Sequence, residues 1–334
     1  MKWIRVLATA VQIALAGLSH PAAAADRPLK IVMASTPSYT WLPFLVAQKT
    51  TFNDLKKQIG RDVEVTYAPT TTPAILGLIA GDYDFGIAYV QHAIKAQAEG
   101  KDLVVLMALM DNPTAAIVVR SDLDKIKNLA DLKGTSLGVV GIGSGHQMIG
   151  IAVARAAGLQ PDDLTYRAVG GLSGIIPAMR SKRVDEVVAS EPTLSKLLEE
   201  KLGRILIDLH STEATHKIFN GPHPTVALIA RREYVDAHPD VARAVVAANL
   251  NALKWIHDHS PTEIAALLPE DVRKQGDSQA ILARVLPALS TTGETKPEAV
   301  SLAVDLMKDM GEVTKDAKID PNAVIDEKFL KPVH

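Results

Sequence analysis

The sequence predicts an α/β protein made of two lobes and followed by a helical tail. Strand and helix patterns alternate from residue 29 to residue 120, and the same alternation starts again at residue 131. From Tyr234 onward the pattern is almost continuously helical. The 334 residues also exceed the ~250 to 300 at which a single hydrophobic core stops growing, so two domains are expected.

The first unit alternates β-type apolar runs with helical segments. Pro73 after Thr72 favours the start of a helix, and Gly81 favours its end. Strand, helix and strand in succession predict a parallel sheet covered on both faces. The predicted strands are Leu29 to Met33, Val63 to Tyr67, Phe85 to Ala88, Leu103 to Leu109 and Ala115 to Val119, with helices at Trp41 to Lys49 and Pro73 to Ala80.

The second unit follows the same order, and one further strand is predicted at Val226 to Ala230. In the tail, an apolar stripe at helical spacing runs through Val241, Val245, Ala248, Ala252 and Trp255. The predicted strands of the second unit are Ser136 to Val140, Leu164 to Ala168, Glu186 to Ala189 and Ile205 to Asp208, with helices at Gln147 to Ala157, Ile175 to Arg180 and Thr193 to Lys201.

This order predicts a discontinuous architecture, in which the chain leaves lobe I, builds lobe II and returns. We place the crossings near Ala115 to Val119 and near Pro224 to Ala230. Lobe I then comprises 26–116 and 225–334, and lobe II comprises 117–224. Two short connections of this kind would act as a hinge that lets the lobes close over a ligand.

The N-terminus predicts export. A basic start at Lys2 and Arg5, an apolar run from Val6 to Leu18 and small residues from Ala22 to Ala25 are typical of a secretory signal peptide, 1–25. The alternative is a membrane anchor, but the apolar run is shorter than the ~20 residues that span a bilayer. We therefore expect the protein to act in the periplasm, without a lipid anchor.

Composition narrows the possible partners. A formal net charge of −2 argues against nucleic acid, and 47% apolar with 22% charged residues is ordinary for a globular protein. The chain has no cysteine, which excludes disulfides, thiolate metal sites and a cysteine nucleophile. We expect a monomer that takes up a small molecule and needs neither a metal nor a cofactor.

A series of motifs along residues 29 to 230 resembles a known family. In order, these are Trp41 to Ala47 after the first strand, Ile79 to Gly86 at the third, Asp131 to Gly134, Gly143 to His146 at a helix start, and Glu191-Pro192. The chain is similar to the periplasmic substrate-binding proteins of ABC importers, in the group for nitrate, sulfonates, taurine and thiamine precursors. The resemblance implies a type II periplasmic-binding-protein fold, a ligand in the cleft between the lobes and a membrane permease as partner.

The glycine-rich turn from Gly141 to His146 is the first candidate site. It follows a strand and opens a helix, so its backbone N–H groups would face an anionic group, with Ser144, Gly145 and His146 as contacts. The alternative is a turn that only caps the helix. A dinucleotide site is excluded because His146 stands where the third glycine would be.

Three further loops follow strands and carry polar or aromatic side chains suited to a small ligand. Trp41 can equally be a core residue of the first helix. Tyr89 and Gln91 lie where the family pattern places cleft residues. The candidates are Ser38, Tyr39, Thr40 and Trp41 in the first loop, Thr71 in the second, and Tyr89 and Gln91 in the third.

Glu191 is the last candidate, although an acid beside Pro192 is also ordinary helix-start chemistry. Facing the cleft, it would repel a simple anion and favour an amine. None of these loops contains Arg or Lys, so any anion would be held mainly by neutral dipoles. The ligand class stays open, and the aromatic first loop favours a small organic molecule over nitrate.

Two other functions compete with transport. An exported hydrolase is disfavoured because Ile142 and His146 stand where the G-x-S-x-G motif requires glycine, and H-E-x-x-H is missing. A ligand-sensing protein would share the cleft but would pass a conformational signal to a membrane receptor. The expected function is therefore solute binding and not catalysis.

Overall fold

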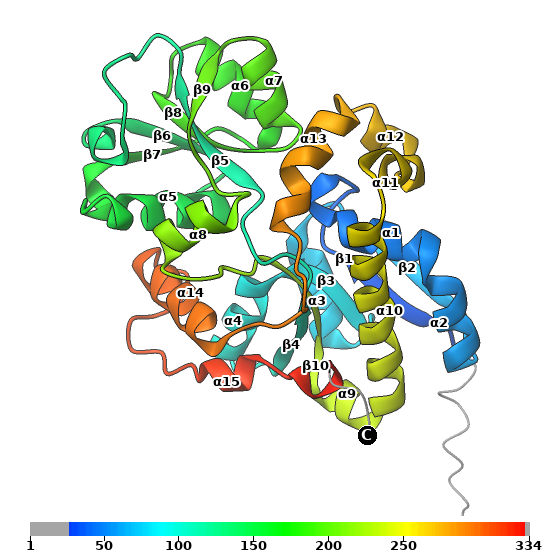
Figure 1. The fold of residues 1–334 in the computed structure, drawn as a ribbon. Coiled ribbons are helices and arrows are strands. Elements are labelled where there is room, and N and C mark those ends of the chain that lie inside the picture. The colour runs from blue at the N-terminus through cyan, green and yellow to red at the C-terminus, as the bar shows by residue number, and fades with distance from the viewer. Residues whose placement is uncertain (1–26, 331–334) are drawn as a thin grey trace, which may run out of the picture.

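The computed structural model describes residues 27–330, shown in Figure 1. The predicted signal peptide and its cleavage site lie outside these residues. Within 27–330 no helix has both the length and the apolar character needed to cross a membrane.

Lobe I is built on a five-stranded sheet in the order β2-β1-β3-β10-β4. β1 is parallel to both β2 and β3, in agreement with the predicted strand–helix alternation. Its strands are β1 (Leu29–Met33), β2 (Val63–Tyr67), β3 (Phe85–Tyr89), β4 (Leu103–Ala108) and β10 (Val226–Arg231), and its helices are α1 (Leu42–Thr50), α2 (Phe52–Ile59), α3 (Thr71–Ala80) and α4 (Val90–Ala98).

Lobe II repeats this plan with the strand order β7-β6-β8-β5-β9. β6 is parallel to β7 and β8. Its strands are β5 (Ala115–Arg120), β6 (Ser136–Val139), β7 (Thr165–Ala168), β8 (Glu186–Ser190) and β9 (Gly203–Asp208), and its helices are α5 (Gly145–Ala156), α6 (Leu172–Arg180), α7 (Thr193–Glu199) and α8 (Thr212–Phe219).

Each sheet contains one antiparallel strand, which corrects the prediction of purely parallel sheets. β10 runs against β3 and β4, and β5 runs against β8 and β9. Both strands are the first that the chain forms after arriving from the other lobe. Each therefore enters its sheet from the opposite end to the strands that are connected by helices.

The chain crosses between the lobes in segments 109–114 and 220–225, a few residues before the predicted crossings. Ala115 and Ala116, which we assigned to lobe I, pair with Ser190 and Ala189 in the sheet of lobe II. Asn112 in the first crossing donates to the His210 carbonyl at 3.4 Å and to the Pro287 carbonyl at 3.2 Å. One buried amide thus joins the start of α8 to the tail.

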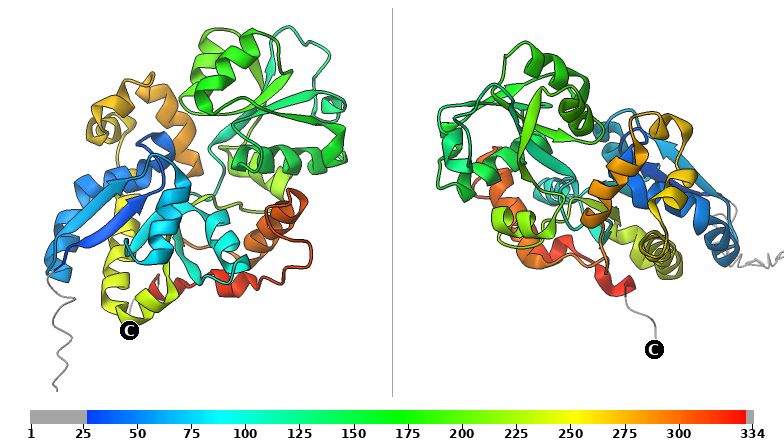
Figure 2. Two further views of the ribbon diagram at one scale, coloured as in Figure 1. Left: turned by 180° about the vertical axis from the view of Figure 1, so that it is seen from behind. Right: turned by 45° about the horizontal axis from the view of Figure 1, so that its top comes forward.

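The tail is helical, as predicted, and contacts both lobes (Figure 2). The long helix α10 packs on α1 and α2, α13 packs on the first loop of lobe I, and α14 lies between α4 of lobe I and α5 of lobe II. Its helices are α9 (Arg232–Ala237), α10 (Pro239–Asp258), α11 (Pro261–Leu267), α12 (Glu270–Arg273), α13 (Ser278–Val285), α14 (Pro297–Asp309) and α15 (Pro321–Val324).

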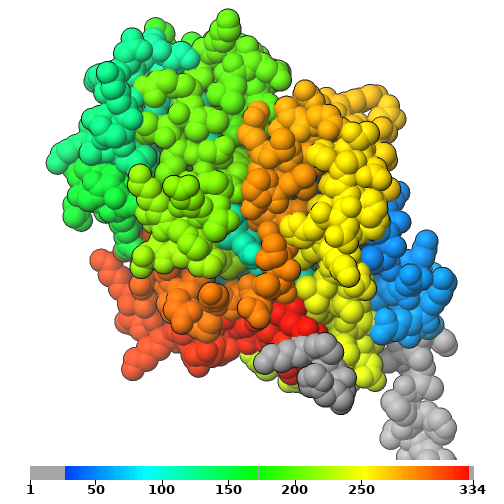
Figure 3. Space-filling view, in the orientation of Figure 1, coloured from blue at the N-terminus to red at the C-terminus, as the bar shows by residue number. Residues whose placement is uncertain are grey.

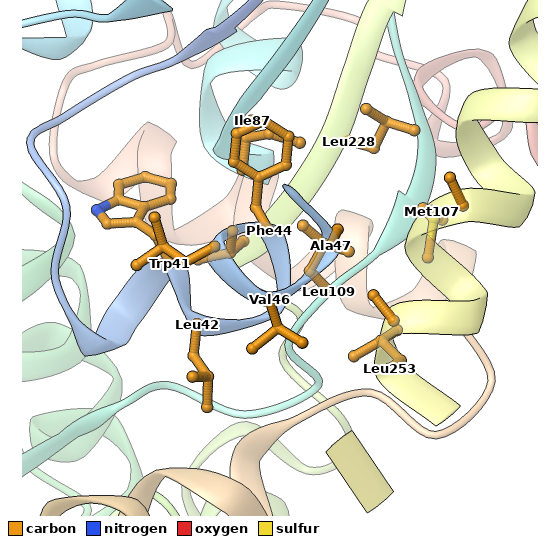
Figure 4. Close-up of a cluster of buried hydrophobic side chains, with 14 of the residues drawn as sticks. Trp41, Leu42, Phe44, Val46, Ala47, Ile87, Met107, Leu109, Leu228 and Leu253 are labelled. Carbon is orange, nitrogen blue, oxygen red and sulfur yellow. The ribbon is translucent and has the colours of Figure 1, made fainter. Parts of the chain in front are cut away.

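The core of lobe I lies between its sheet and helices α1 and α10. Figure 4 shows Phe44 and Val46 of α1 among side chains of β3, β4, β10 and α10, including Ile87, Leu228 and Leu253. A second buried cluster continues from one lobe into the other through α4, α14 and α5. The lobes therefore meet over packed apolar surface next to α14, on one side of the candidate site.

Candidate functional site

A cavity of about 300 Å³ lies where the two lobes meet. Lobe I contributes α3 and α4, and lobe II contributes the turn before α5 and the first turns of that helix. The end of α14 and the residues after it close the remaining side. The lining residues are Thr71, Thr72, Ile75, Leu76, Ile79, Gln91, His92, Lys95, Ala96, Glu99, Gly143, Met148, Met307, Met310 and Glu312.

The lining combines apolar side chains with polar ones, and some of the polar ones follow the ends of parallel strands. Thr71 and Gln91, both candidates from the sequence, lie among these polar groups. The Thr71 hydroxyl donates to the Ala34 carbonyl at 3.1 Å, which fixes the side chain at the end of β1. An apolar cavity with a few fixed polar groups is typical of a small-molecule site.

The glycine-rich turn has the predicted relation to α5. Ser144 is the N-cap of the helix, and its Oγ accepts a hydrogen bond from the Gln147 backbone N–H at 3.4 Å. Gly143 has φ +79°, and its N–H donates to Gln147 Oε1 at 2.8 Å. A Cβ on Gly145 would lie 3.6 Å from the Gln91 amide, so lobes I and II come into close contact here.

His146 points into lobe II and not toward solvent. Its Nε2 lies 3.3 Å from Ser190 Oγ, and burial lowers the pKa of its imidazole to about 4. The ring is therefore neutral at ordinary pH. Its buried Nδ1 has no hydrogen-bond partner among the described residues, so a small shift of this ring would offer a polar atom to a ligand.

The aromatic candidates form a buried cluster beside the cavity. Tyr39 is 0% exposed, and its hydroxyl oxygen lies 2.6 Å from Ser278 Oγ of α13. Trp41 is a core residue, with its ring 5.3 Å from that of Tyr89. Burial raises the pKa of Tyr89 to about 12. Tyr39 and Trp41 are packed away in this conformation, and contact between them and a ligand stays a prediction.

Ser38 and Thr40 are half-buried in the first loop. The Ser38 carbonyl accepts from the Trp41 N–H at 3.0 Å and so forms the short helical turn Tyr39–Trp41. Gln275 donates to the Pro37 carbonyl at 3.4 Å, which ties the loop to the tail. Neither hydroxyl is among the cavity-lining groups.

Glu191 is buried, and its carboxylate is already engaged. Arg284 Nε of α13 donates to Oε1 at 2.9 Å, and the Ser195 backbone N–H donates to Oε2 at 3.1 Å. A second guanidinium nitrogen donates to Ser195 Oγ at 3.1 Å. Figure 3 shows the orange segment that contains α13 lying against lobe II. In this conformation Arg284 compensates the charge of Glu191, and a contact between Glu191 and a ligand stays a prediction.

Basic residues do reach the site, from helices and not from the loops considered above. Lys95 lies one turn after Gln91 on α4, and a helical period counted from Gln91 would have found it. Its Nζ lies 2.6 Å from Glu312 Oε2. Glu312 and Arg284 come from the tail, and Arg284 is 93 residues away from Glu191 in the sequence. No local sequence signal points to either residue.

The chain matches a known protein family over most of its length. The family described as NMT1/THI5 like matches residues 39–264. A protein of Brucella abortus (strain 2308), named as a binding protein, is 25% identical over 239 residues, which cover 71% of this chain and 70% of that protein. The nitrate/nitrite binding protein NrtA of Nostoc sp. (strain PCC 7120) is 28% identical over 131 residues, covering 39% of this chain and 28% of NrtA.

Solved structures share the fold. A protein from Bordetella bronchiseptica RB50 has a TM-score of 0.74 and 26% identity, covering 92% of this chain and 96% of that one. The periplasmic aliphatic sulphonate binding protein SsuA from Escherichia coli has a TM-score of 0.72 and 22% identity, with 91% and 99% covered. The nitrate-binding protein NrtA from Synechocystis PCC 6803 has a TM-score of 0.70 and 15% identity, with 91% and 87% covered. The predicted periplasmic-binding-protein fold is confirmed.

Proposed function

Because the chain belongs to the NMT1/THI5-like family, we propose that it is the solute-binding component of an ABC import system. The protein captures a small organic molecule between its lobes and delivers it to a membrane permease. The observation that carries this proposal is the cavity of about 300 Å³ lined by both lobes. A ligand held there contacts lobes I and II together, and so favours their closed arrangement over the open one.

The proposed ligand is organic, such as a sulfonate or an aromatic acid. Ile75, Ile79 and three methionines supply far more apolar surface than an inorganic ion such as nitrate can use. The sulphonate-binding neighbour SsuA supports this choice through its fold, whereas NrtA is named for nitrate. Neutral polar contacts would come from Thr71, Gln91, Ser144 and Nδ1 of His146.

The proposed setting is the periplasm, where the protein acts as a monomer. The signal-like N-terminus supports export, and the crossings 109–114 and 220–225 support hinged closure of lobe I on lobe II. In the closed protein, both lobes face the permease in a fixed orientation relative to each other. Opening on the permease then releases the solute unchanged.

A ligand-sensing protein remains the second candidate, since it would use the same cavity and the same closure. It differs in its partner, which would be a membrane receptor and not a permease. An exported hydrolase is the third, and it differs by consuming the compound. Co-purification of detergent-solubilised membrane partners separates the first two, and recovery of the bound compound separates the third.

Native mass spectrometry of the purified protein, followed by denaturation and identification of the released small molecule, tests the proposal. We expect one compound per chain, saturable rebinding to the emptied protein, and full recovery of that compound after prolonged incubation. A chemically altered compound would favour the hydrolase. Failure to retain any compound from a periplasmic extract, or to rebind one, would contradict solute binding.

A further inference from the structure

The cavity between the lobes is lined by an ion pair whose two residues lie outside the loops that the sequence predicts for the site. Lys95 projects from α4 of lobe I, and its Nζ lies 2.6 Å from Glu312 Oε2 in the segment after α14. Both side chains line the cavity. Glu99, one turn further along α4, is the other carboxylate of the lining, and His92 is kept neutral because burial lowers its pKa to about 4.

The second oxygen of Glu312 lies against lobe II. A Cβ built on Gly143 would meet Glu312 Oε1, so a side chain at residue 143 would push the Glu312 carboxylate aside. Gly143, with φ +79°, also stands immediately before the N-cap of α5. The Glu312 carboxylate therefore spans the gap between Lys95 of lobe I and the turn that opens α5, where the helix dipole favours negative charge.

The ion pair between Lys95 and Glu312 is weak enough for a ligand to replace the Glu312 carboxylate. The Lys95 and Glu312 side chains are 44% and 29% exposed, so water already competes for both. Pairs of this kind contribute about 0 to 1 kcal/mol to stability. A free anion of the right shape could replace the tethered carboxylate with little loss to the fold. By contrast, Glu191 is buried and engaged on both oxygens.

We propose that Glu312 is an internal stand-in for the anionic group of the ligand, and that Lys95 is the residue that pairs with that group when the ligand displaces Glu312. The ligand class is an organic carboxylate or sulfonate with a short apolar body. The body lies against Ile75, Ile79, Met148, Met307 and Met310. This inference rests on the proposed solute-binding function and names the residue that selects its ligand by charge.

The affinity of the protein for its ligand depends on the displacement of Glu312 from Lys95. In the wild-type protein the ligand competes with a carboxylate that is held beside Lys95 by the chain itself. Removing the charge of Glu312 ends this competition and leaves Lys95 free for the incoming anion. Removing the charge of Lys95 ends the attraction for both carboxylates.

Calorimetric titration with 1-butanesulfonate, pentanoate and butylammonium tests the proposal on emptied wild-type protein, Glu312→Gln, Lys95→Met and the double variant. We expect Glu312→Gln to bind both anions about fivefold tighter and Lys95→Met to bind them about fivefold weaker, in line with a half-exposed pair. The double variant should bind the anions no tighter than wild type, because without Lys95 the removal of the Glu312 charge gains no attraction. The gain in Glu312→Gln should shrink at 0.5 M salt because screening weakens the attraction of Lys95.

Glu200→Gln is the matched control. Glu200 lies 2.5 Å from Arg180 on the surface of lobe II and is 30% exposed, close to the value for Glu312, but it lies outside the cavity lining. It should leave the affinity for all three probes unchanged. Unfolding midpoints in urea for all variants establish that each one is folded.

Three outcomes would overturn the proposal. The first is that both anions bind wild type and Glu312→Gln with equal affinity, and the second is that neither protein binds an anion. The third is that wild type binds butylammonium and Glu312→Gln does not, which would make Glu312 itself a ligand contact. Solute binding as such fails separately. A co-purified compound that binds equally to every variant contradicts the stand-in but keeps the function, whereas no retained or rebound compound in any protein contradicts the function.

Discussion

Two charge pairs lie close to where the lobes meet, and they differ in how completely each is satisfied. Arg284 and Glu191 are joined at 2.9 Å, with Glu191 buried and Ser195 bound to both partners. Lys95 and Glu312 are joined at 2.6 Å, but both are partly exposed beside an open cavity. A saturated buried pair resists exchange, whereas a half-exposed pair next to a cavity can give way to a ligand. The first contact therefore holds the lobes and the second contact selects what they hold.

The largest expected effect comes from breaking the buried pair. Arg284→Met leaves the Glu191 carboxylate buried without its cation, and we expect a loss of about 3 kcal/mol in the free energy of unfolding. Urea unfolding measures it. Arg180→Met, which breaks the surface pair with Glu200, is the control and should cost under about 1 kcal/mol. Equal losses in the two variants would remove the distinction between the pairs.

The double variant Arg284→Met with Glu191→Gln sharpens the comparison. Removing the stranded charge should recover at least about 1 kcal/mol of the loss, because an amide is less costly to bury than a carboxylate. Ligand-free small-angle scattering of the single variant should also show a larger radius of gyration than that of wild type. An unchanged radius would mean that the apolar contacts around α14 hold the lobes without Arg284.

Glu186 is a buried acid with no cation of its own, which contrasts with Glu191. Burial raises the pKa of its carboxyl to about 8, with Asp185 adding to the rise. Thr135 Oγ lies 2.5 Å from the Leu132 carbonyl and 2.7 Å from Glu186 Oε1. The Thr135 hydroxyl donates to Glu186 Oε1, which lowers the pKa of Glu186 but offsets only part of the rise caused by burial.

The folded state therefore binds one more proton than the unfolded state between the ordinary carboxyl pKa and about 8. The free energy of unfolding should fall as pH rises through this window. Glu186→Gln should remove that slope and raise stability at pH 8 by about 2 kcal/mol relative to wild type. Urea unfolding at pH 5, 6.5 and 8 measures both, and an unchanged slope would show that Glu186 is ionised in the folded protein.

Gly143→Ala tests the contact between Glu312 and lobe II. A side chain at φ +79° costs about 1 kcal/mol, and its Cβ would push the flexible end of Glu312 aside, which adds under about 1 kcal/mol to the expected loss. Adding Glu312→Ala should remove the collision and leave the backbone cost. Simple additivity of the two substitutions would show that Glu312 does not rest against Gly143 in solution.

The smallest expected effect is that of Lys95→Met on stability. Since the pair with Glu312 is half-exposed, the free energy of unfolding should change by less than about 1 kcal/mol. Lys56→Met is a matched control, because the Lys56 side chain is 41% exposed and pairs with Asp62 on the surface. A loss above about 2 kcal/mol for Lys95→Met alone would make the pair structural and not exchangeable.

The positions of the strands along the chain and the helical tail could be predicted because their signals are local. Apolar runs such as Val63 to Tyr67, and the helix start and stop at Pro73 and Gly81, depend on neighbouring residues only. The direction of β5 and β10 could not be predicted this way. Whether a strand runs parallel depends on which lobe the chain comes from, and that is a property of the whole path.

The residues of the site also divide into those that local sequence signals predict and those that only the folded chain brings together. Thr71, Gln91 and the turn before α5 follow strands, and the rule for open sheets places them at one edge. Tyr39 is buried because Ser278, 239 residues away, covers its hydroxyl. The charges that matter most belong to Glu312, in the segment after α14, and to Arg284 of α13. The sequence alone does not place these tail residues beside Lys95 and Glu191.

Hydrogen–deuterium exchange on the protein saturated with its co-purified compound tests the central claim most directly. A solute trapped between the lobes should slow exchange in 71–79 and 91–99 of lobe I and in 143–148 of lobe II together. Protection confined to one lobe, or absent from all three segments, would contradict a site shared between the lobes.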